Sequence, residues 1–267
     1  MRLGCICGSF NRAFAAGAMD QLRFVAHCKD VLGVAGVEFQ DIHFPETRPA
    51  YLDRLRRAAA DRGLSVIGIG IHNDFGRRDE CLRASEVVKV KQWVEVAERL
   101  GAPMVRVFAG WPEGTAAERW ADMIAALQEA SAFAHAAGVR LALENEAGFT
   151  PSVAEHVRIL EEVGSPALGL LLDTGNYPAG WPSVEQAAPR AMHVHAKFWK
   201  VGPGGEEPTM NYPALLTQLR QAHYPGWITF EYEAAEPEAT GLPRAFTYLR
   251  RLLEDDRVVG ERAGGRS

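Results

Sequence analysis

Short apolar runs alternate with amphipathic stretches along nearly the whole chain. The apolar runs are continuous rather than alternating, which is typical of parallel strands buried on both faces. They predict strands at residues 3–7, 35–39, 65–71, 104–108, 139–144, 168–173, 191–195 and 227–231. Between them, apolar positions recur at helical spacing and predict helices near residues 19–31, 50–62, 81–100, 116–137, 153–163, 184–188, 212–222 and 243–253.

Eight strand–helix units in about 250 residues are the proportion of a TIM barrel. We therefore expect an α/β protein, a single-domain (β/α)8 barrel over residues 1–254, followed by a charged, Gly-rich tail over residues 255–267 that we expect to be disordered. A doubly wound open sheet is disfavoured, because no glycine-rich phosphate turn follows the first predicted strand.

Strand parity sorts the residues of each predicted strand into an outer and an inner set, since successive side chains point to opposite faces. Leu143, Leu172, Val194 and Phe230 are expected to face the helices, as are the isoleucines at 67, 69 and 71. The opposite parity places four polar side chains toward the barrel axis, at the carboxyl ends of four consecutive strands: Glu144, Asp173, His195 and Glu231. Barrel active sites occupy this rim, so the four residues are the strongest functional signal in the chain.

Further inward-facing candidates are weaker when taken singly. Glu38, His72 and Arg106 have the parity of substrate-binding residues, although Arg106 could simply neutralise nearby carboxylates. His193 is expected to be a core histidine one layer below His195. The helical histidines at 27, 135 and 156 are expected at the surface, and the tryptophans at 111, 181 and 199 in loops beyond strand ends, either as walls of a sugar site or as hydrophobic caps.

Composition narrows the functional class. The 267-residue chain has a formal net charge of -5, which gives no reason to expect a nucleic-acid partner. It has no signal-peptide pattern and no apolar run long enough to span a bilayer, so we expect a cytoplasmic protein without a membrane partner. Its four cysteines lack zinc-finger spacing and suit buried thiols in a reducing compartment.

Three carboxylates and one imidazole form a mostly hard, oxygen-rich set of ligands. The set suits one divalent metal ion, Mn²⁺ or Mg²⁺ first and Co²⁺ or Zn²⁺ second. Such an ion can chelate the carbonyl and neighbouring hydroxyl of a polyol and stabilise the enediolate formed on proton loss. Glu144 and Glu231 would then be the acid/base pair. Proton return gives epimerisation or aldose–ketose isomerisation, whereas loss of a β-hydroxyl gives a dehydratase, and the four residues do not choose among these.

Several motifs together resemble the sugar phosphate isomerase/epimerase family, which has the xylose isomerase-like TIM barrel. They are GVEF (36–39), VRVFAG (105–110), LENE (143–146), DTGN (173–176), HVHAK (193–197) and GWITFEYE (226–233). The resemblance implies a metal held by Glu144, Asp173, His195 and Glu231. It also implies substrate contacts from Asn176 and Lys197, a carbohydrate substrate, and relatives that include ketose 3-epimerases, hydroxypyruvate isomerase and inosose dehydratase.

The chain departs from the family where Phe198 and Trp199 follow Lys197, a place where many relatives have an acid. The arginine that some ketose epimerases carry a few residues later is also absent. Both departures indicate a less polar substrate end. An apurinic-site endonuclease is disfavoured because its additional histidines are missing, and a non-catalytic binding barrel is disfavoured because all four ligands are present. The sequence is compatible with a homo-oligomer and does not decide the oligomeric state.

Overall fold

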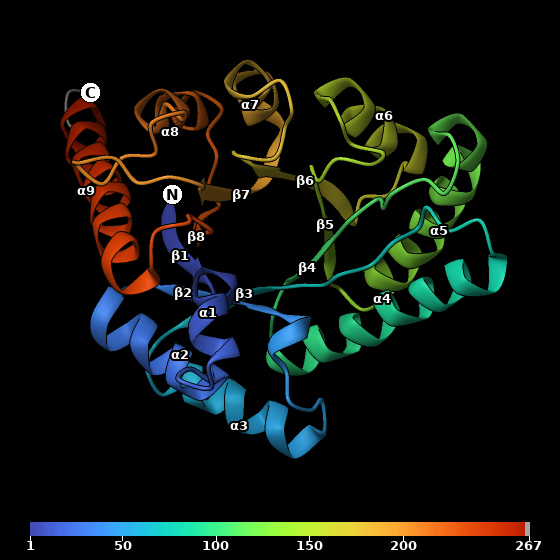
Figure 1. The fold of residues 1–267 in the computed structure, drawn as a ribbon, viewed down its shortest axis with the longest axis horizontal. Helices are drawn as coiled ribbons and strands as arrows, with labels where there is room; N and C mark the ends of the chain where they lie inside the picture. Colours follow the sequence, from blue (N-terminus) through green and yellow to red (C-terminus); the bar gives the residue numbers. More distant parts are fainter. Residues whose placement is uncertain (265–267) are drawn as a thin grey trace.

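The computed structural model describes residues 1–264, with side chains up to residue 254. Within them, eight parallel strands close into a barrel in the order of the sequence. Helices surround the barrel on all sides (Figure 1), so the expected single (β/α)8 domain is confirmed. The expected disorder of residues 255–267 concerns a segment whose side chains lie outside the described part, and it stays a prediction.

The strands are β1 (Arg2–Ile6), β2 (Gly36–Gln40), β3 (Ser65–Gly70), β4 (Met104–Val107), β5 (Arg140–Glu144), β6 (Leu168–Asp173), β7 (Ala191–Phe198) and β8 (Trp227–Tyr232). β7 is three residues longer than expected, which places Lys197 in the sheet, paired with Glu231 of β8. Both residues therefore lie at the same level of the barrel mouth.

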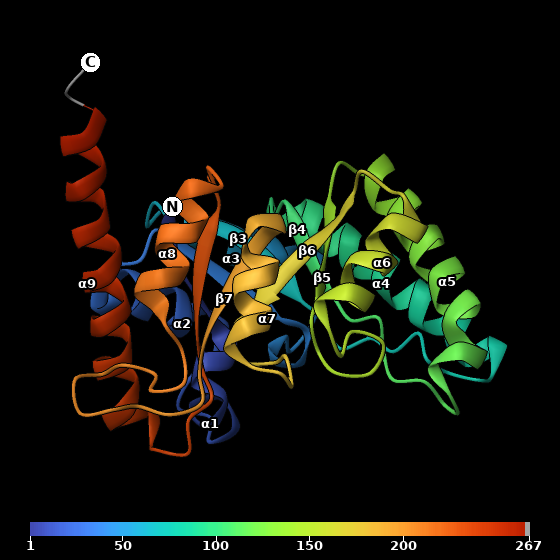
Figure 2. The ribbon, with the colours of Figure 1, turned by 90° about the horizontal axis from the view of Figure 1, so that it is seen from above.

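The α-helices are α1 (Asn11–Ala15), α2 (Gln21–His27), α3 (Pro49–Ala60), α4 (Glu80–Leu100), α5 (Ala116–Ala136), α6 (Val153–Val163), α7 (Trp181–Ala187), α8 (Tyr212–Gln221) and α9 (Glu238–Gly264). A π-helical turn (Cys28–Leu32) extends α2, and short 3-10 turns occur at Cys7–Phe10, Asp41–His43 and Ala188–Arg190. The sequence pattern did not predict α1 or the first two 3-10 turns, because segments this short have no hydrophobic period. α9 stands along one side of the barrel and extends past it (Figure 2).

Local signals explain the helix ends. Thr115 and Glu118 form a capping box at the start of α5, each side chain accepting a hydrogen bond from the other's backbone N–H. Gly101 and Gly164 end α4 and α6 in the left-handed conformation, at φ of 73° and 62°, which residues with a Cβ adopt at a cost.

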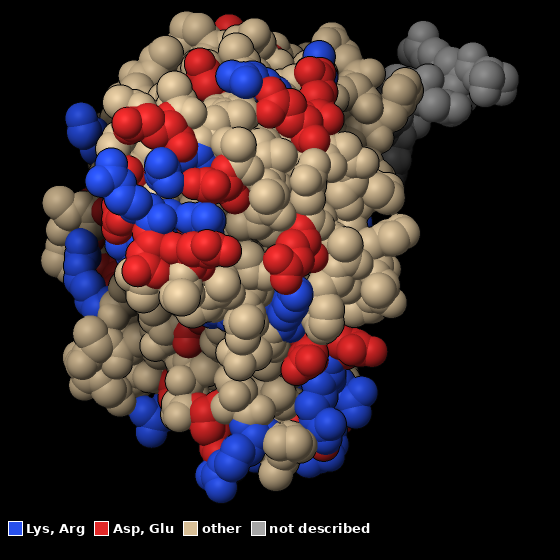
Figure 3. Space-filling model, turned by 90° about the vertical axis from the view of Figure 1, so that its right-hand side faces the viewer, with Lys and Arg blue, Asp and Glu red and all other residues tan. Residues whose placement is uncertain are grey.

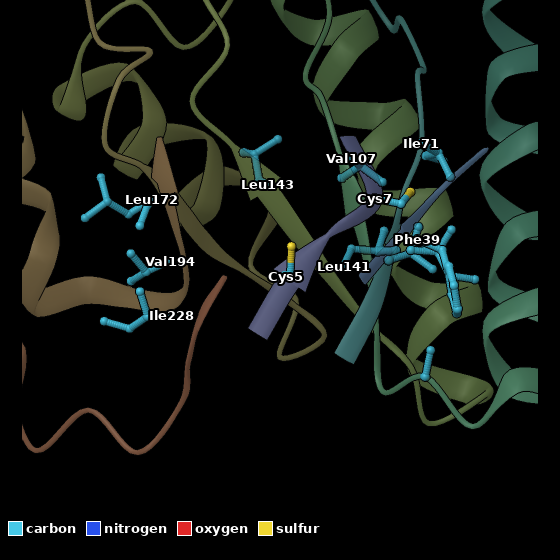
Figure 4. Close-up of a cluster of buried hydrophobic side chains, with 14 of the residues drawn as sticks. Cys5, Cys7, Phe39, Ile71, Val107, Leu141, Leu143, Leu172, Val194 and Ile228 are labelled. Atoms are coloured by element: carbon cyan, nitrogen blue, oxygen red, sulfur yellow. The ribbon is translucent and has the colours of Figure 1, made fainter. Parts of the chain in front are cut away.

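The core has two layers. The larger lies between strands and helices and includes Phe39, Val107, Leu143, Leu172 and Val194 (Figure 4). The smaller fills the lower barrel axis with Ile67, Met104, Ala142, Leu171 and Trp227.

The expected outward position of Ile67 is wrong, while Ile69 and Ile71 lie in the outer layer as expected. The pairing of β2 with β3 shifts at this point, from Val37–Val66 to Glu38–Gly68. A β-bulge adds one residue to a strand and breaks the strict alternation of side chains, so Ile67 joins the axis.

Candidate active site at the barrel mouth

The four rim residues converge at the carboxyl ends of the last four strands. Glu144, Asp173, His195 and Glu231 each offer one ligand atom, and these atoms lie within 4.8 Å of one another. All four side chains are buried. His195 Nδ1 lies 2.8 Å from Glu144 Oε1 and 3.3 Å from Glu231 Oε2. The convergence expected from strand parity is therefore present.

Asn145 fixes the relative position of two of these strands. Its side chain donates to the Asp173 carbonyl at 2.9 Å and accepts from the Asp173 N–H at 2.8 Å. The Asn145 amide thus continues the ladder between β5 and β6 beyond the last backbone pair. The Gly175 N–H donates to Asp173 Oδ1 at 2.7 Å, which fixes the direction of the other oxygen, Oδ2.

Lys197 supplies a buried positive charge to this cluster. Its ammonium lies 3.3 Å from Asp173 Oδ2, 3.1 Å from Glu231 Oε2 and 2.9 Å from Glu233 Oε2. Burial raises the pKa of Asp173 well above its usual value despite the charge of Lys197. Burial also acts to raise the pKa of Glu231, but Lys197 and His195 outweigh it and hold that pKa well below its ordinary value.

Two buried oxygens of the cluster suit a metal ion. Asp173 Oδ2 and Glu231 Oε2 accept no hydrogen bond from the described residues, although Lys197 and His195 lie within ion-pair range. Buried carboxylate oxygens without hydrogen bonds are costly unless a cation satisfies them. Three carboxylates and one imidazole within this span have the chemistry and the spacing for one divalent cation.

Glu38 lies below the cluster rather than at the mouth. It is fully buried, and its two oxygens lie 3.1 Å from His195 Nε2 and 3.1 Å from His193 Nε2. Thr229 Oγ1 lies 3.0 Å from the same nitrogen of His193. With an imidazole on each of its oxygens, Glu38 is placed to orient His195, and its expected contact with a substrate stays a prediction. His193 occupies the lower layer, as expected.

Burial and the neighbouring charges shift the pKa values of His195 and Glu38 in opposite directions. Burial acts to lower the pKa of His195, but the charges of Glu38 and Glu144 raise it well above its usual value. Burial acts to raise the pKa of Glu38, and the two imidazoles reverse this and lower it. A carboxylate on Nε2 fixes the imidazole orientation and leaves Nδ1 directed at the cluster, as in carboxylate–histidine–metal triads.

Arg106 of β4 and His72, which follows β3, lie on the other side of the cluster from Lys197 of β7. Arg106 Nε is 3.1 Å from Glu144 Oε2, and its guanidinium packs 4.2 Å from the centre of the Phe108 ring. His72 is exposed, contacts the Phe108 ring edge-on, and holds Asp41 Oδ1 at 2.7 Å through Nδ1. Arg106 therefore belongs to the cluster, because it contacts Glu144 directly. His72 contacts Phe108, which packs on Arg106, and so lies further from the cluster.

Asn176 and a residue that the sequence reasoning missed form a pair beside the cluster. Asn176 Nδ2 donates to Glu146 Oε2 at 2.6 Å, and both side chains are half-buried. Burial and the nearby charge of Glu144 raise the pKa of Glu146. The signal that could have found Glu146 was its parity, because it lies two residues after Glu144.

His156 corrects a further expectation. It is fully buried rather than at the surface, with Nδ1 2.8 Å from the Tyr177 hydroxyl and Nε2 3.0 Å from the Leu143 carbonyl. It therefore joins α6 to the strand that carries Glu144. Trp181 is the first residue of α7 and packs on the core, whereas Trp111 and Trp199 are exposed in loops.

The outer surface has mixed charge. Lysines and arginines lie next to aspartates and glutamates on the face that Figure 3 shows. On α6, Arg158 and Glu162 form a surface ion pair at 2.6 Å. In the described part of the chain, no helix combines the length and apolar character needed to cross a membrane.

Comparison with known proteins identifies the family. Residues 25–252 match the xylose isomerase-like TIM barrel family. The chain belongs to this family. The C-glycoside deglycosidase alpha subunit of Microbacterium trichothecenolyticum is 32% identical, covering 71% of each chain. The L-ribulose 3-epimerase of Mesorhizobium japonicum is 26% identical, covering 84% of this chain and 82% of its own.

Another relative matches over a shorter stretch. The 3'-dehydrocarminate deglycosidase alpha subunit of a Microbacterium species is 33% identical, over 37% of this chain and 27% of its own length. Among solved structures, the IolI protein with a bound zinc atom superimposes with a TM-score of 0.74 at 18% identity, covering 96% of this chain and 98% of its own. This xylose isomerase-like barrel is thus a relative of sugar-modifying enzymes.

Proposed function

We propose that the protein is a divalent-metal-dependent isomerase or epimerase of a sugar or related keto-polyol. The observation that carries the proposal is the convergence of Glu144, Asp173, His195 and Glu231 within 4.8 Å at the barrel mouth. These four residues would hold the ion. When bound, the ion would polarise the carbonyl of the sugar and offset the negative charge that develops when the neighbouring carbon loses its proton.

The two glutamates perform the proton transfer in this proposal. Burial acts to raise the pKa of Glu144, but Arg106 and His195 outweigh it and lower that pKa, so Glu144 is ionised and can accept a proton. Glu231 enters from a strand three positions away around the barrel. A proton taken by one glutamate and returned by the other to the opposite face of the carbon inverts its configuration.

The remaining rim residues position the substrate. Lys197 lies 3.1 Å from Glu231 and can donate a hydrogen bond to a substrate oxygen. Asn176 with Glu146, and Arg106 and His72 on the other side, offer hydrogen bonds to the hydroxyl groups of a carbohydrate.

The test is exchange of substrate protons with solvent. The protein is loaded with Mn²⁺ and incubated in D₂O with a panel of keto-sugars, and deuterium at the carbon next to the carbonyl is followed by NMR. Replacing Glu144 or Glu231 by Gln should lower the exchange rate at least about 100-fold. Glu113→Gln, at an exposed carboxylate that pairs with Arg77, is the matched control and should keep the native rate. Native exchange in either cluster variant would remove that residue from the mechanism.

A second candidate is a lyase reaction at the same site, which the deglycosidase relatives favour. After a glutamate removes the proton, the electron pair forms a carbon–carbon double bond while the bond from the adjacent carbon to its substituent breaks. The substituent leaves with the electrons of that bond and takes up a proton. The exposed Trp199, two residues after Lys197, is consistent with a substrate that carries an apolar substituent. Release of the substituent in the same NMR experiment would identify this reaction.

A further inference from the structure

Two tryptophans leave apolar surface exposed at the mouth of the barrel. Trp111 and Trp199 are 41% and 42% exposed, and they follow β4 and β7 respectively. Exposed large side chains are usual when scattered, but here each indole is joined to the metal-site cluster through one short series of contacts. The proton transfer between the two glutamates proposed above uses neither ring.

The first series runs along β4. Arg106 contacts Glu144 and packs over Phe108, whose ring meets the Trp111 indole edge-on at 5.5 Å between centroids. The backbone of Trp111 is held by Asp74 Oδ1, which accepts its N–H at 2.9 Å. Gly76 packs so closely that a Cβ there would overlap the Trp111 carbonyl. The indole is therefore fixed at its base and free at its outer face.

The second series runs along β7. Lys197 contacts Asp173 and Glu231, and its ammonium lies 4.9 Å from the centre of the Trp199 ring. Trp199 Nε1 donates to the Gly175 carbonyl at 3.2 Å, two residues after Asp173. A Cβ at Gly175 would overlap the indole, so this ring rests directly on the loop that follows a cluster residue.

We propose that Trp111 and Trp199 form a subsite for a planar aromatic substituent of the substrate, so that the substrate is a keto-glycoside rather than a free ketose. This inference rests on the proposed function, because the sugar must lie at the cluster for its substituent to reach the indoles. Aromatic rings pack favourably on tryptophan, whereas a free ketose has no aromatic ring to offer to an indole.

The chemistry of keto-sugars agrees with this choice. In a cyclic free ketose the carbonyl carbon is the anomeric carbon and is consumed by ring closure. A glycoside with its ketone at another ring carbon retains both the carbonyl and the anomeric substituent. Such a substrate presents a carbonyl and a neighbouring hydroxyl to the cluster while its aromatic group extends to the rim.

The experiment compares phenyl and methyl 3-keto-β-D-glucopyranoside on the Mn²⁺-loaded protein. Proton exchange or substituent release gives kcat/KM, and calorimetry gives binding independently of turnover. We expect the phenyl-to-methyl ratio of affinities to fall about five- to tenfold in Trp111→Ala and in Trp199→Ala. Trp199→Phe should restore much of it. Leu82→Ala, which removes a 54% exposed side chain on α4, should leave both substrates unaffected.

The outcomes separate the two proposals. Turnover of both glycosides with an equal ratio in native protein and tryptophan variants would overturn the subsite and keep the proposed function. Preferential binding of the phenyl compound without turnover or exchange would keep the subsite and reject the proposed function. Equal binding of both compounds without turnover would reject both.

Discussion

Replacing Lys197 by methionine should destabilise the metal-free protein and leave the metal-loaded protein nearly unchanged. Lys197 is the ammonium that lies within 3.3 Å of Asp173 and Glu231, and all three side chains are at most 5% exposed. Methionine has a similar length and no charge, so the substitution removes the cation while largely keeping the volume. The carboxylates would then face one another without this counter-charge.

The magnitude follows from the distances. At about 3.2 Å and an effective dielectric constant of about 20, each attraction is worth roughly 5 kcal/mol before the cost of desolvating the ammonium. Removing one partner of a buried ion pair costs about 3–5 kcal/mol net. In a chain of this size that lowers Tm by about 6–20 °C. Proton uptake by Asp173, whose pKa burial already raises, would keep the loss toward the smaller value.

The assay is thermal unfolding followed by circular dichroism, in EDTA and in saturating MnCl₂. A divalent ion would supply the missing positive charge, so Mn²⁺ should raise the Tm of Lys197→Met more than that of the native protein. The variant should also bind Mn²⁺ at least about tenfold more tightly in calorimetry, because the ammonium no longer repels the ion.

The matched control is Lys91→Met, since Lys91 pairs with the 61% exposed Glu129 at 2.7 Å. Such a surface pair contributes less than about 1 kcal/mol, so its loss should change Tm little in either buffer. Equal losses of Tm for Lys197→Met with and without Mn²⁺ would refute the reasoning, because Lys197 would then contribute ordinary packing and not the charge that a metal ion replaces.

Three further predictions concern Glu38, the metal ion and His156. Glu38→Gln should weaken Mn²⁺ binding by about 10–100-fold in calorimetry by loosening the orientation of His195, and unchanged affinity would deny Glu38 this role. Removing metal with EDTA should abolish proton exchange and Mn²⁺ should restore it, whereas full exchange after verified metal removal would exclude the mechanism. Burial lowers the pKa of His156 to about 4, so the native protein should lose about 3 kcal/mol of unfolding free energy as the pH falls from about 6.5 to 4, since the unfolded chain takes up the proton first. Urea unfolding of His156→Gln should lack this part of the pH dependence, and identical slopes would contradict the assignment.

Strand positions could be predicted because each strand is buried on both faces and each helix on one. The run at residues 168–173 reads Leu-Gly-Leu-Leu-Leu-Asp, and the observed β6 has these bounds. Parity then placed Asp173 toward the axis correctly. It failed at Ile67, where a bulge shifts the register, because a one-residue insertion depends on the neighbouring strand and leaves no period in the sequence.

The rim cluster could be predicted from the sequence, whereas the depth of the residues around it could not. A barrel brings strand ends together by closure, so inward parity at four consecutive strands suffices to gather Glu144, Asp173, His195 and Glu231. The position of Glu38 is a matter of depth along the axis. Shear between strands sets that depth, and the residues of β2 alone do not contain it.

His156 shows why the burial of a residue on a helix could not be predicted from the sequence pattern of that helix. A histidine on an amphipathic helix is exposed unless the opposite element supplies partners for both nitrogens. Here those partners are the Leu143 carbonyl and the Tyr177 hydroxyl, which belong to different strand–helix units. Such a contact exists only once β5, α6 and the loop after β6 have packed together, so the pattern of α6 alone predicted the wrong environment.

In the proposed mechanism, the choice among epimerase, isomerase and lyase is made outside the four cluster residues. All three reactions begin with removal of the same proton, and they diverge according to whether the proton returns before a substituent leaves. Return requires a protonated carboxyl on the opposite face, and the ammonium of Lys197 beside Glu231 opposes that protonation by holding the pKa of Glu231 low. Departure requires a substituent bound and aligned beyond the sugar, which a ring on Trp111 and Trp199 would provide. Variants of the ammonium and of the indoles should therefore change the ratio of exchange to release, while variants of Glu144 or Glu231 should lower both together.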